Sequence, residues 1–337
     1  MQISTSCNVG GAYFNYPLTE LESTRDELVM CDLSQYATIK VSGEDALNFL
    51  QNMLSSDVRE VSPQRTQISS LNSPKGRMLA CLLVWRRQDD YFLHLPHSLC
   101  SPILKRLSMY VLRAKVKIED VSAQQICLGL NGADSEGLIQ RAFGSAPQAV
   151  WAVEQHDRAS VIRCDTQRFL IATSEQDVPV IWQKLAVSAR PVAATCWDWL
   201  NIRAGIPVIL PGTQDQFVPQ MANLELIGGV SFKKGCYPGQ EIVARMQYLG
   251  KLKRRMFLAH MDQVKIKGNA MPQPGDELYS ADMEGQACGM VVNATLAPNG
   301  GCDLLAVVQI GSRETQNIYL QSLQGAVLQF LPLPYLL

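Results

Sequence analysis

The chain has 337 residues, of which 47% are hydrophobic and 18% charged, and its 30 basic and 31 acidic side chains give a net charge of -1. This length suits two or three domains with substantial apolar cores. The composition excludes a mainly disordered chain, and the near-zero charge argues against a protein that binds nucleic acid or membranes over its whole surface.

Strands and helices alternate through residue 250, which predicts an α+β or α/β region. Apolar runs between turn residues predict strands at 37–41, 77–85, 91–95, 115–119, 126–130, 161–164 and 168–171. Helical spacing of apolar residues predicts helices over 99–112, 134–143 and 197–204. Two further helices are predicted, one that begins at Ser174-x-x-Asp177 and one that begins at the capping-box pattern Ser42-Gly-Glu-Asp45.

The pattern changes after residue 253. Strand-like segments at 257–261, 286–294 and 302–309 are separated by Pro- and Gly-rich turns, as in a small β-barrel or sandwich. We therefore predict two domains, 1–250 and 251–337.

The ten cysteines include no C-x-x-C pair, which disfavours structural zinc and a resident iron–sulfur cluster. The N-terminal residues lack a basic start followed by an apolar run, and no apolar stretch is long enough to cross a membrane. We expect a cytoplasmic protein with reduced thiols, no resident metal and no membrane association.

The segment 233–255 combines charge with a dense motif. It holds seven basic residues and one acid, Glu241, so it carries +6 while the rest of the chain carries -7. Its centre reads Lys233-Lys-Gly-Cys-Tyr-Pro-Gly-Gln-Glu-Ile-Val-Ala-Arg245. Pro238-Gly239 favours a helix start, with Ile242, Val243 and Met246 facing inward. A thiol at Cys236 beside lysines and a helix N-terminus favours a reactive thiolate, whereas the alternative is an ordinary buried cysteine.

Lys234-Gly-Cys-Tyr-Pro-Gly-Gln-Glu241 resembles the K-G-C-[YF]-x-G-Q-E signature of the YgfZ family, folate-binding proteins similar to the T-protein (aminomethyltransferase) of the glycine cleavage system. The resemblance extends over about residues 36–255 through the blocks at 38–58, 71–77, 200–207 and 219–224. It implies two interleaved α+β subdomains around a central channel for tetrahydrofolate, followed by a C-terminal β-barrel.

The resemblance also implies roles for individual residues. Trp197 and Tyr36 fall on positions whose aromatic side chains line the folate site, although Tyr36 replaces a tryptophan of the family. Cys236 would be the functional thiol, positioned by Lys234, Gln240, Glu241 and Arg245. For Trp197 and Tyr36 the alternative is core packing.

For the remaining basic residues and for the histidines, the sequence allows either a binding role or a purely structural or solvated one. Lys75 and Arg77 could meet the glutamate tail of folate or be solvated, and the run 251–255 could hold polyglutamate, RNA phosphates or nothing. His94 and His97 have the spacing of a metal pair but no evident third ligand.

Glycine-cleavage aminomethyltransferases carry acidic residues where this chain has Leu79 and Ala80, which argues against aminomethyl transfer. The resemblance thus implies a folate-binding accessory protein that supports iron–sulfur cluster assembly or repair in enzymes such as those that methylthiolate tRNA. The alternatives are a folate-dependent one-carbon transferase or demethylase, or a folate- or RNA-binding module without chemistry. Direct contact with tRNA stays open.

Overall fold

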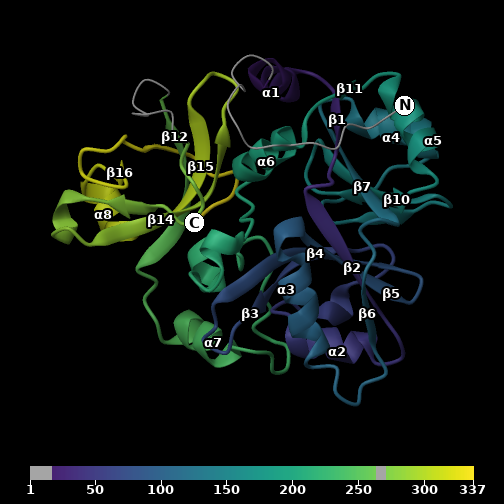
Figure 1. Cartoon of the computed structure of the whole chain (residues 1–337), viewed down its shortest axis with the longest axis horizontal. Helices are drawn as coiled ribbons and strands as arrows, with labels where there is room; N and C mark the ends of the chain where they lie inside the picture. Colours follow the sequence, from purple (N-terminus) through teal and green to yellow (C-terminus); the bar gives the residue numbers. More distant parts are fainter. Residues whose placement is uncertain (1–16, 263–270) are drawn as a thin grey trace.

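The computed structural model of the protein describes residues 17–262 and 271–337, so Cys7 and the rest of the N-terminal segment lie outside the described residues. Three β-sheets organise these residues, and Figure 1 shows one at the left and two at the right. No helix in the described ranges is long and apolar enough to cross a membrane.

The first sheet has six strands in the order β11-β1-β7-β10-β9-β8. Side chains alternate along β10, so that Phe169 and Ile171 pack under α4 and α5 while Leu170 and Ala172 face α6 and α1. These strands and helices are β1 (Val29–Asp32), β7 (Gln125–Asn131), β8 (Val153–Gln155), β9 (Ala159–Arg163), β10 (Arg168–Ser174), β11 (Arg190–Pro191), α1 (Pro17–Asp26), α4 (Ser135–Phe143), α5 (Val178–Ala186) and α6 (Ala194–Arg203).

The second sheet has the order β3-β4-β5-β2-β6, with two helices packed against it. Its elements are β2 (Tyr36–Ser42), β3 (Gln67–Asn72), β4 (Met78–Arg87), β5 (Asp90–Pro96), β6 (Lys117–Asp120), α2 (Ala46–Met53), α3 (His97–Ser108) and the short 3₁₀ helix η1 (Val58–Glu60). The chain enters the first sheet at β1, leaves it for the second sheet at β2 and returns at β7. This interleaving confirms the predicted fold class.

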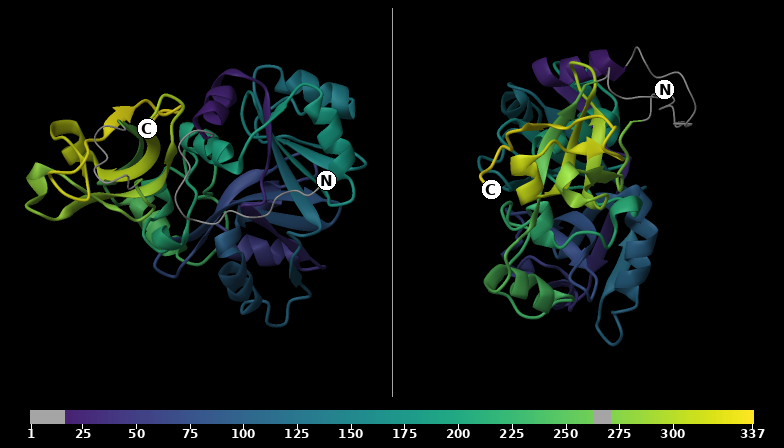
Figure 2. Two further views of the ribbon diagram at one scale, coloured as in Figure 1. Left: turned by 45° about the horizontal axis from the view of Figure 1, so that its top comes forward. Right: turned by 90° about the vertical axis from the view of Figure 1, so that its left-hand side faces the viewer.

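The third sheet has the order β16-β13-β14-β15-β12-β17 and curls into a half-barrel (Figure 2). An isolated bridge between Tyr319 of β16 and Val327, and backbone hydrogen bonds on either side of it, join β16 to the segment just before β17. Its elements are β12 (Arg254–Met261), β13 (Glu277–Tyr279), β14 (Ala287–Leu296), β15 (Cys302–Gln309), β16 (Tyr319–Leu320), β17 (Gln329–Leu331), α8 (Ile310–Thr315) and η6 (Ala281–Met283).

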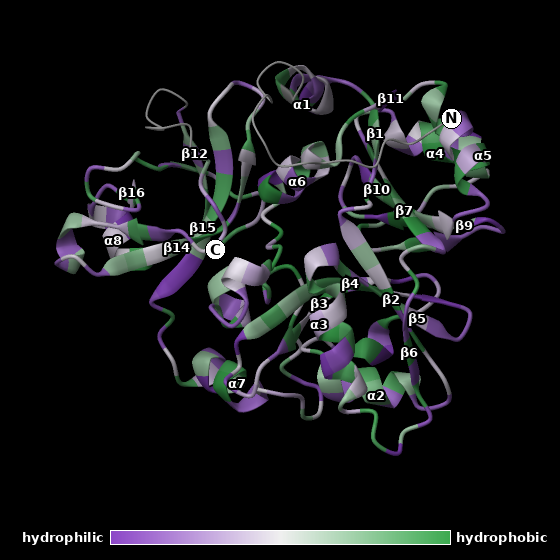
Figure 3. Ribbon diagram, in the orientation of Figure 1, coloured by the Kyte–Doolittle hydropathy of each residue, from purple (hydrophilic) through white to green (hydrophobic). Residues whose placement is uncertain are grey.

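The half-barrel shares a hydrophobic core with the second sheet. Figure 3 shows hydrophobic segments along the strands of the three sheets. Leu258, Leu305 and Val307 belong to the same buried cluster as Leu82, Val84 and other residues of the second sheet. The division into domains 1–250 and 251–337 remains a prediction. The segment that links α6 to the half-barrel contains η2 (Pro211–Thr213), η3 (Pro219–Ala222) and α7 (Gln240–Tyr248).

Two local predictions were wrong. Ser42 is the last residue of β2, and α2 begins three residues later than expected, at Ala46. The residue before the helix, Asp45, makes no side-chain hydrogen bond to the amides of its first turn, so the expected capping box does not form. In α7 only Val243 is buried, whereas Ile242 is 39% exposed, because the helix meets the rest of the molecule through a narrow contact with η3 and the turn at 72–76.

Candidate functional site

A partly open cavity of about 80 Å³ lies where the two subdomains meet. Strands β2, β4 and β5 of the second sheet, β10 of the first sheet and helix α6 line it. Both predicted cofactor-binding residues, Tyr36 and Trp197, are among the lining side chains. The structure thus brings these two aromatic residues, 161 positions apart, to one cavity.

Trp197 lies against β7 at Gly129. A Cβ atom at Gly129 would be 2.5 Å from Cε3 of the indole, so only glycine leaves room for the ring at this position. The guanidinium of Arg168 lies 5.1 Å from the centre of the Trp197 ring, within the range of a cation–π contact. Trp197 is 4% exposed. The indole is therefore held firmly while it lines the cavity.

Tyr36 stacks on a histidine that the sequence patterns did not single out for this cavity. The rings of Tyr36 and His94 are 4.8 Å apart and inclined by 22°. The amide of Asn201 donates a hydrogen bond of 2.9 Å to the Tyr36 hydroxyl, which in turn donates to Asp198 at 3.4 Å. Helix α6 thus supplies the polar partners that orient Tyr36.

Both ring nitrogens of His94 are buried, and neither has a hydrogen-bond partner within the ranges that the structure describes. Burial lowers the pKa of His94 to about 3, so the imidazole is neutral near pH 7. A neutral imidazole has one donor and one acceptor nitrogen. Because buried polar atoms are normally satisfied, these two nitrogens are an unusual feature of the cavity wall.

Arg168 is almost fully buried beside the same cavity. It donates to the amide oxygen of Asn201 at 2.7 Å, and its Nε lies 3.0 Å from the Asp165 carboxylate. The pairing compensates for the desolvation of the charge. Arg168 therefore brings a fixed positive charge to the cavity wall.

A second cavity, of about 240 Å³, adjoins the first and extends toward the half-barrel. Asp198 lines it, and its carboxylate accepts only long hydrogen bonds from Gln35 and Tyr36, of 3.5 and 3.4 Å. Burial raises the pKa of Asp198 to about 6. Oε1 of Gln35 is a further buried atom without a partner in the described part of the chain.

Lys234 of the cysteine motif makes structural contacts. Its Nζ donates to the carbonyl oxygens of Gln51, Leu54 and Ser56, at 2.6, 2.6 and 2.8 Å. All three ammonium hydrogens are thereby used, at the C-terminal end of α2, where carbonyl groups need partners. Burial lowers the pKa of Lys234 to about 8. Lys234 anchors the loop rather than presenting a free charge to Cys236.

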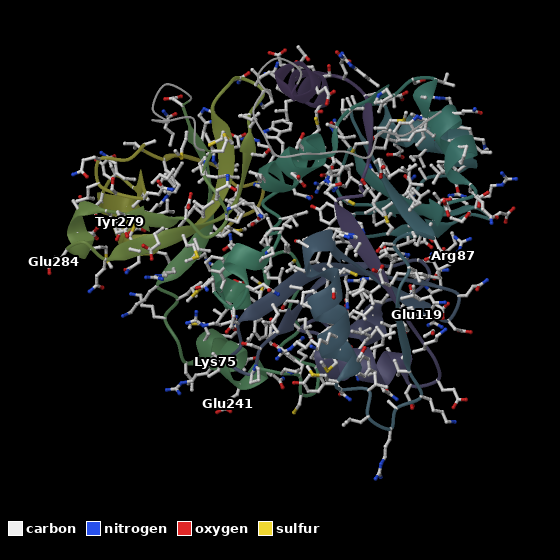
Figure 4. All side chains as sticks on the ribbon, viewed as in Figure 1. Lys75, Arg87, Glu119, Glu241, Tyr279 and Glu284 are labelled. Carbon is white, nitrogen blue, oxygen red and sulfur yellow. The ribbon has the colours of Figure 1, made fainter. Side chains whose placement is uncertain are left out.

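Cys236 is exposed, whereas the other eight described cysteines are buried. The Gln240 amide donates to the Lys234 carbonyl at 3.5 Å, which is the long limit of a hydrogen bond. Glu241 and Arg245 are exposed on α7, and Glu241 points outward in Figure 4. No hydrogen bond or ion pair joins Cys236 to these side chains in the described structure. Their supporting roles remain predictions.

The turn 72–76 and the cysteine motif meet through two glycines. A Cβ atom at Gly239 would lie 2.4 Å from Cα of Gly76 and 2.4 Å from the Ser73 carbonyl oxygen. Both glycines have positive φ angles, 70° at Gly76 and 76° at Gly239. Figure 4 labels Lys75, in this turn, close to Glu241, which belongs to α7.

The basic residues near the site have different environments. Arg77 donates to the carbonyls of Asp215 and Gln216, and Arg255 pairs with Glu225 at 2.8 Å. Arg254 donates to a backbone carbonyl of β14. Within the run 251–255, Lys251 and Lys253 are the exposed cations. The net charge of +6 is therefore not a single positive surface.

The strand positions that hold acids in aminomethyltransferases carry Leu79, which is half-buried, and Ala80, which is fully buried in the core. The described residues contain no group of three or more His, Cys, Asp or Glu side chains placed to hold a metal ion. His94, Arg168 and Asp198 were missed as site residues. Of these three, only His94 stood out in the sequence, as a polar residue inside the apolar run 91–95.

Comparison with known proteins identifies the fold and the family. The GCVT N-terminal domain family matches residues 11–226. The structure of the glycine cleavage system aminomethyltransferase T from Bartonella henselae superposes with a TM-score of 0.75 at 18% identity, covering 95% of this chain and 89% of that chain. The chain therefore has the fold of a glycine cleavage T-protein.

Two curated relatives are named tRNA-modifying protein YgfZ. The protein from Colwellia psychrerythraea is 30% identical over 293 residues, which cover 83% of this chain and 89% of the relative. The protein from Escherichia coli O6:H1 is 29% identical over 323 residues, which cover 95% and 97%. With its T-protein fold and this similarity over nearly its whole length, the chain belongs to the YgfZ family.

Proposed function

We propose that the chain binds a reduced folate in the central cavity and thereby supports tRNA modification in the cytoplasm, through the maintenance of iron–sulfur enzymes and with Cys236 as its functional thiol. The name of the relatives supports the link to tRNA modification. The T-protein fold supports folate as the ligand class.

The observation that carries the folate proposal is His94. Its two nitrogens face no protein partner among the described residues, in a cavity that Tyr36 and Trp197 also line. A pterin is flat and bears hydrogen-bond donors and acceptors along its edge, so it suits aromatic walls and a neutral imidazole. Tyr36, Trp197 and His94 would hold the ring, with Arg168 and Asn201 beside it.

Bound tetrahydrofolate would supply a carrier for one-carbon units. Leu79 and Ala80 can neither accept a proton nor hold an ammonium group, which supports an accessory role over aminomethyl transfer. Cys236 supports the thiol role through its exposure, because burial raises the pKa of thiols such as Cys81 and Cys164 to about 12 and keeps them inert.

Titration with tetrahydrofolate, followed by tryptophan fluorescence, tests the folate proposal. We expect saturable quenching that is reduced in Trp197→Phe, with the remainder coming from Trp151, which also lines the cavity. Quenching should be retained in full in Trp182→Phe, whose indole on α5 packs against the core beneath α4 and α5 and does not line the cavity. His94→Phe should keep the stacking on Tyr36 but weaken binding about tenfold, since a polar partner is removed. Equal affinity of His94→Phe and the wild type would overturn the assignment.

Complementation tests the thiol. In cells that lack the endogenous YgfZ-family gene, Cys236→Ala should fail to restore tRNA methylthiolation while retaining the wild-type melting temperature and folate affinity. Cys288→Ala is the matched control, because this cysteine is buried in the half-barrel core. Full restoration of methylthiolation by Cys236→Ala would remove Cys236 from the proposal and leave folate binding untouched.

A further inference from the structure

The segment 233–255 carries two kinds of basic side chain. Lys234, Arg254 and Arg255 bind carbonyl or carboxylate oxygens of the protein. The other four are exposed, and none forms an ion pair or a side-chain hydrogen bond with a residue that the structure describes: Lys233, Arg245, Lys251 and Lys253. The acid of the segment, Glu241, is exposed and pairs with none of them. These four cations are therefore free to pair with an external anion.

An exposed aromatic ring lies at the end of α7. Tyr248 is the last residue of the helix and is 68% exposed. Its ring meets that of Phe232 edge to face, with the ring centres 6.2 Å apart and the planes inclined by 72°. This contact places the end of α7 beside the loop that carries Lys233 and Cys236. The tyrosine ring is supported by a neighbour and still open to solvent, as a ring that stacks on an unpaired base must be.

The free cations surround this ring along the chain. Arg245 precedes Tyr248 by three residues on α7, which puts the two on the same side of the helix. The two amides that follow Tyr248 donate to the Arg245 carbonyl at 2.9 Å each, and the exposed Lys251 and Lys253 come next. Figure 1 shows α7 at the lower edge of the molecule, with this run leading up from it to β12. The ring and the cations thus belong to one exposed end of α7.

This combination of side chains fits an unpaired stretch of RNA better than a protein partner. The centres of protein interfaces are depleted in lysine, whereas three of the four free cations are lysines. Single-stranded nucleic acid is held by cations along its backbone and by aromatic rings on which its bases stack. A base can reach an exposed ring in this way only where it is not paired, as in the loops and ends of folded RNA.

We propose that this face binds an unpaired segment of tRNA directly, with a base stacked on Tyr248 and phosphates at the free cations. The face consists of six side chains: Phe232, Lys233, Arg245, Tyr248, Lys251 and Lys253. Cys236 lies on the loop between Phe232 and α7, so the bound RNA would lie on the side of the molecule that carries the exposed thiol. This inference rests on the proposed role in tRNA modification and adds a direct contact with the RNA.

Fluorescence anisotropy of a labelled, unmodified tRNA transcript, titrated with the full chain at several salt concentrations, tests the contact. With four phosphate contacts, the affinity of the wild type should fall about 60-fold between about 50 and 200 mM salt. Lys251→Gln/Lys253→Gln should weaken binding and about halve the slope of log affinity against log salt, because two of the four cations are removed. Tyr248→Leu should weaken binding about tenfold and leave this slope unchanged, because it removes stacking but no charge.

The loop after α3 offers matched controls on another surface of the chain. Tyr110 is 41% exposed there, and Lys105 and Arg113 are exposed cations. Lys105→Gln/Arg113→Gln and Tyr110→Leu should bind the transcript as the wild type does. A fully paired RNA duplex should bind more weakly than the transcript, and Tyr248→Leu should not change its affinity, because it offers no base for stacking.

Several results would overturn the inference while leaving the folate titration and the Cys236 complementation to decide the proposed function. The first is a wild type that does not bind the transcript, or that binds a poly-glutamate peptide equally well. The second is an equal loss of affinity in the controls, which would mean that RNA is held by overall charge. The third is a Tyr248→Leu variant that fails in complementation but binds RNA normally, which would assign the face to a protein partner.

Discussion

At the scale of single residues, Asp198 is a carboxyl group whose surroundings disfavour its charge. It lines a cavity, no ion pair reaches it in the described structure, and its hydrogen bonds to Gln35 and Tyr36 are long. Burial raises its pKa from 3.8 to about 6. Between these two values the folded chain binds a proton at Asp198 that the unfolded chain releases. The stability that this proton confers is present below about pH 4 and is lost as the pH rises through 6.

We expect Asp198→Asn to remove this pH dependence. Urea unfolding of the wild type should show a stability component that declines between pH 4 and 6, and the variant should lack it. At pH 7 the variant should be more stable by roughly 2 kcal/mol, because no charge is buried. Glu314→Gln, which removes an exposed acid from α8, should behave like the wild type. An unchanged pH profile in Asp198→Asn would contradict the assigned pKa.

Sequence reasoning at this scale found the aromatic residues but not their polar partners. Trp197 and Tyr36 came from the family resemblance, and the strand that contains His94 was predicted from its apolar run. The position of His94 at the cavity depends on β5 pairing with β2, which sets His94 opposite Thr38. Registers between strands 50 residues apart depend on the packing of the whole sheet, so a local pattern does not reveal them.

At the scale of elements, the start of α7 depends on a close approach of two loops. The backbone at Gly239 passes so near to Ser73 and Gly76 that a side chain would overlap both. This contact joins two of the segments that resemble the family, the turn at 72–76 and the segment around Cys236. The sequence predicted a helix start at Pro238-Gly239 but not its contact with the turn at 72–76, because the two segments are more than 160 residues apart.

We expect Gly239→Ala to separate α7 from this turn. Its Cβ would overlap backbone atoms at 2.4 Å, and the positive φ of 76° adds strain for alanine. Limited proteolysis should then cut the segment 233–250 faster in the variant. Gly235→Ala, on the same loop with no atom within 4 Å of the added Cβ, should be cut at the wild-type rate. Equal cleavage of the two variants would refute the role of the glycine contact.

At the scale of the whole molecule, helix α6 and the half-barrel are joined by buried polar contacts as well as by apolar packing. Asp303 of β15 accepts a hydrogen bond of 2.9 Å from the Trp199 indole and lies 2.8 Å from Nδ1 of His260. The change to strands after residue 253 was apparent in the sequence. The sequence did not reveal that the half-barrel and the second sheet share one hydrophobic core, because composition does not tell against which element the apolar face of a strand packs.

Neighbouring leucines on β15 test whether the half-barrel unfolds with the rest of the chain. Leu305 belongs to the core shared with the second sheet, and Leu304 to the core inside the half-barrel. All five tryptophans lie between residues 85 and 199, but Trp199 is hydrogen-bonded to Asp303 of the half-barrel. In a Trp199→Phe background the remaining four therefore report on the other two sheets.

We expect one cooperative transition, in which Leu304→Ala and Leu305→Ala each lower the free energy of unfolding by about 2–5 kcal/mol. The shift caused by Leu304→Ala should therefore be visible in tryptophan fluorescence as well as in circular dichroism, although Leu304 packs inside the half-barrel. A fluorescence midpoint that Leu304→Ala leaves unchanged, with a second transition in circular dichroism, would instead mean that residues 251–337 unfold independently. Leu305→Ala would then still lower the fluorescence midpoint, because its side chain packs in the shared core.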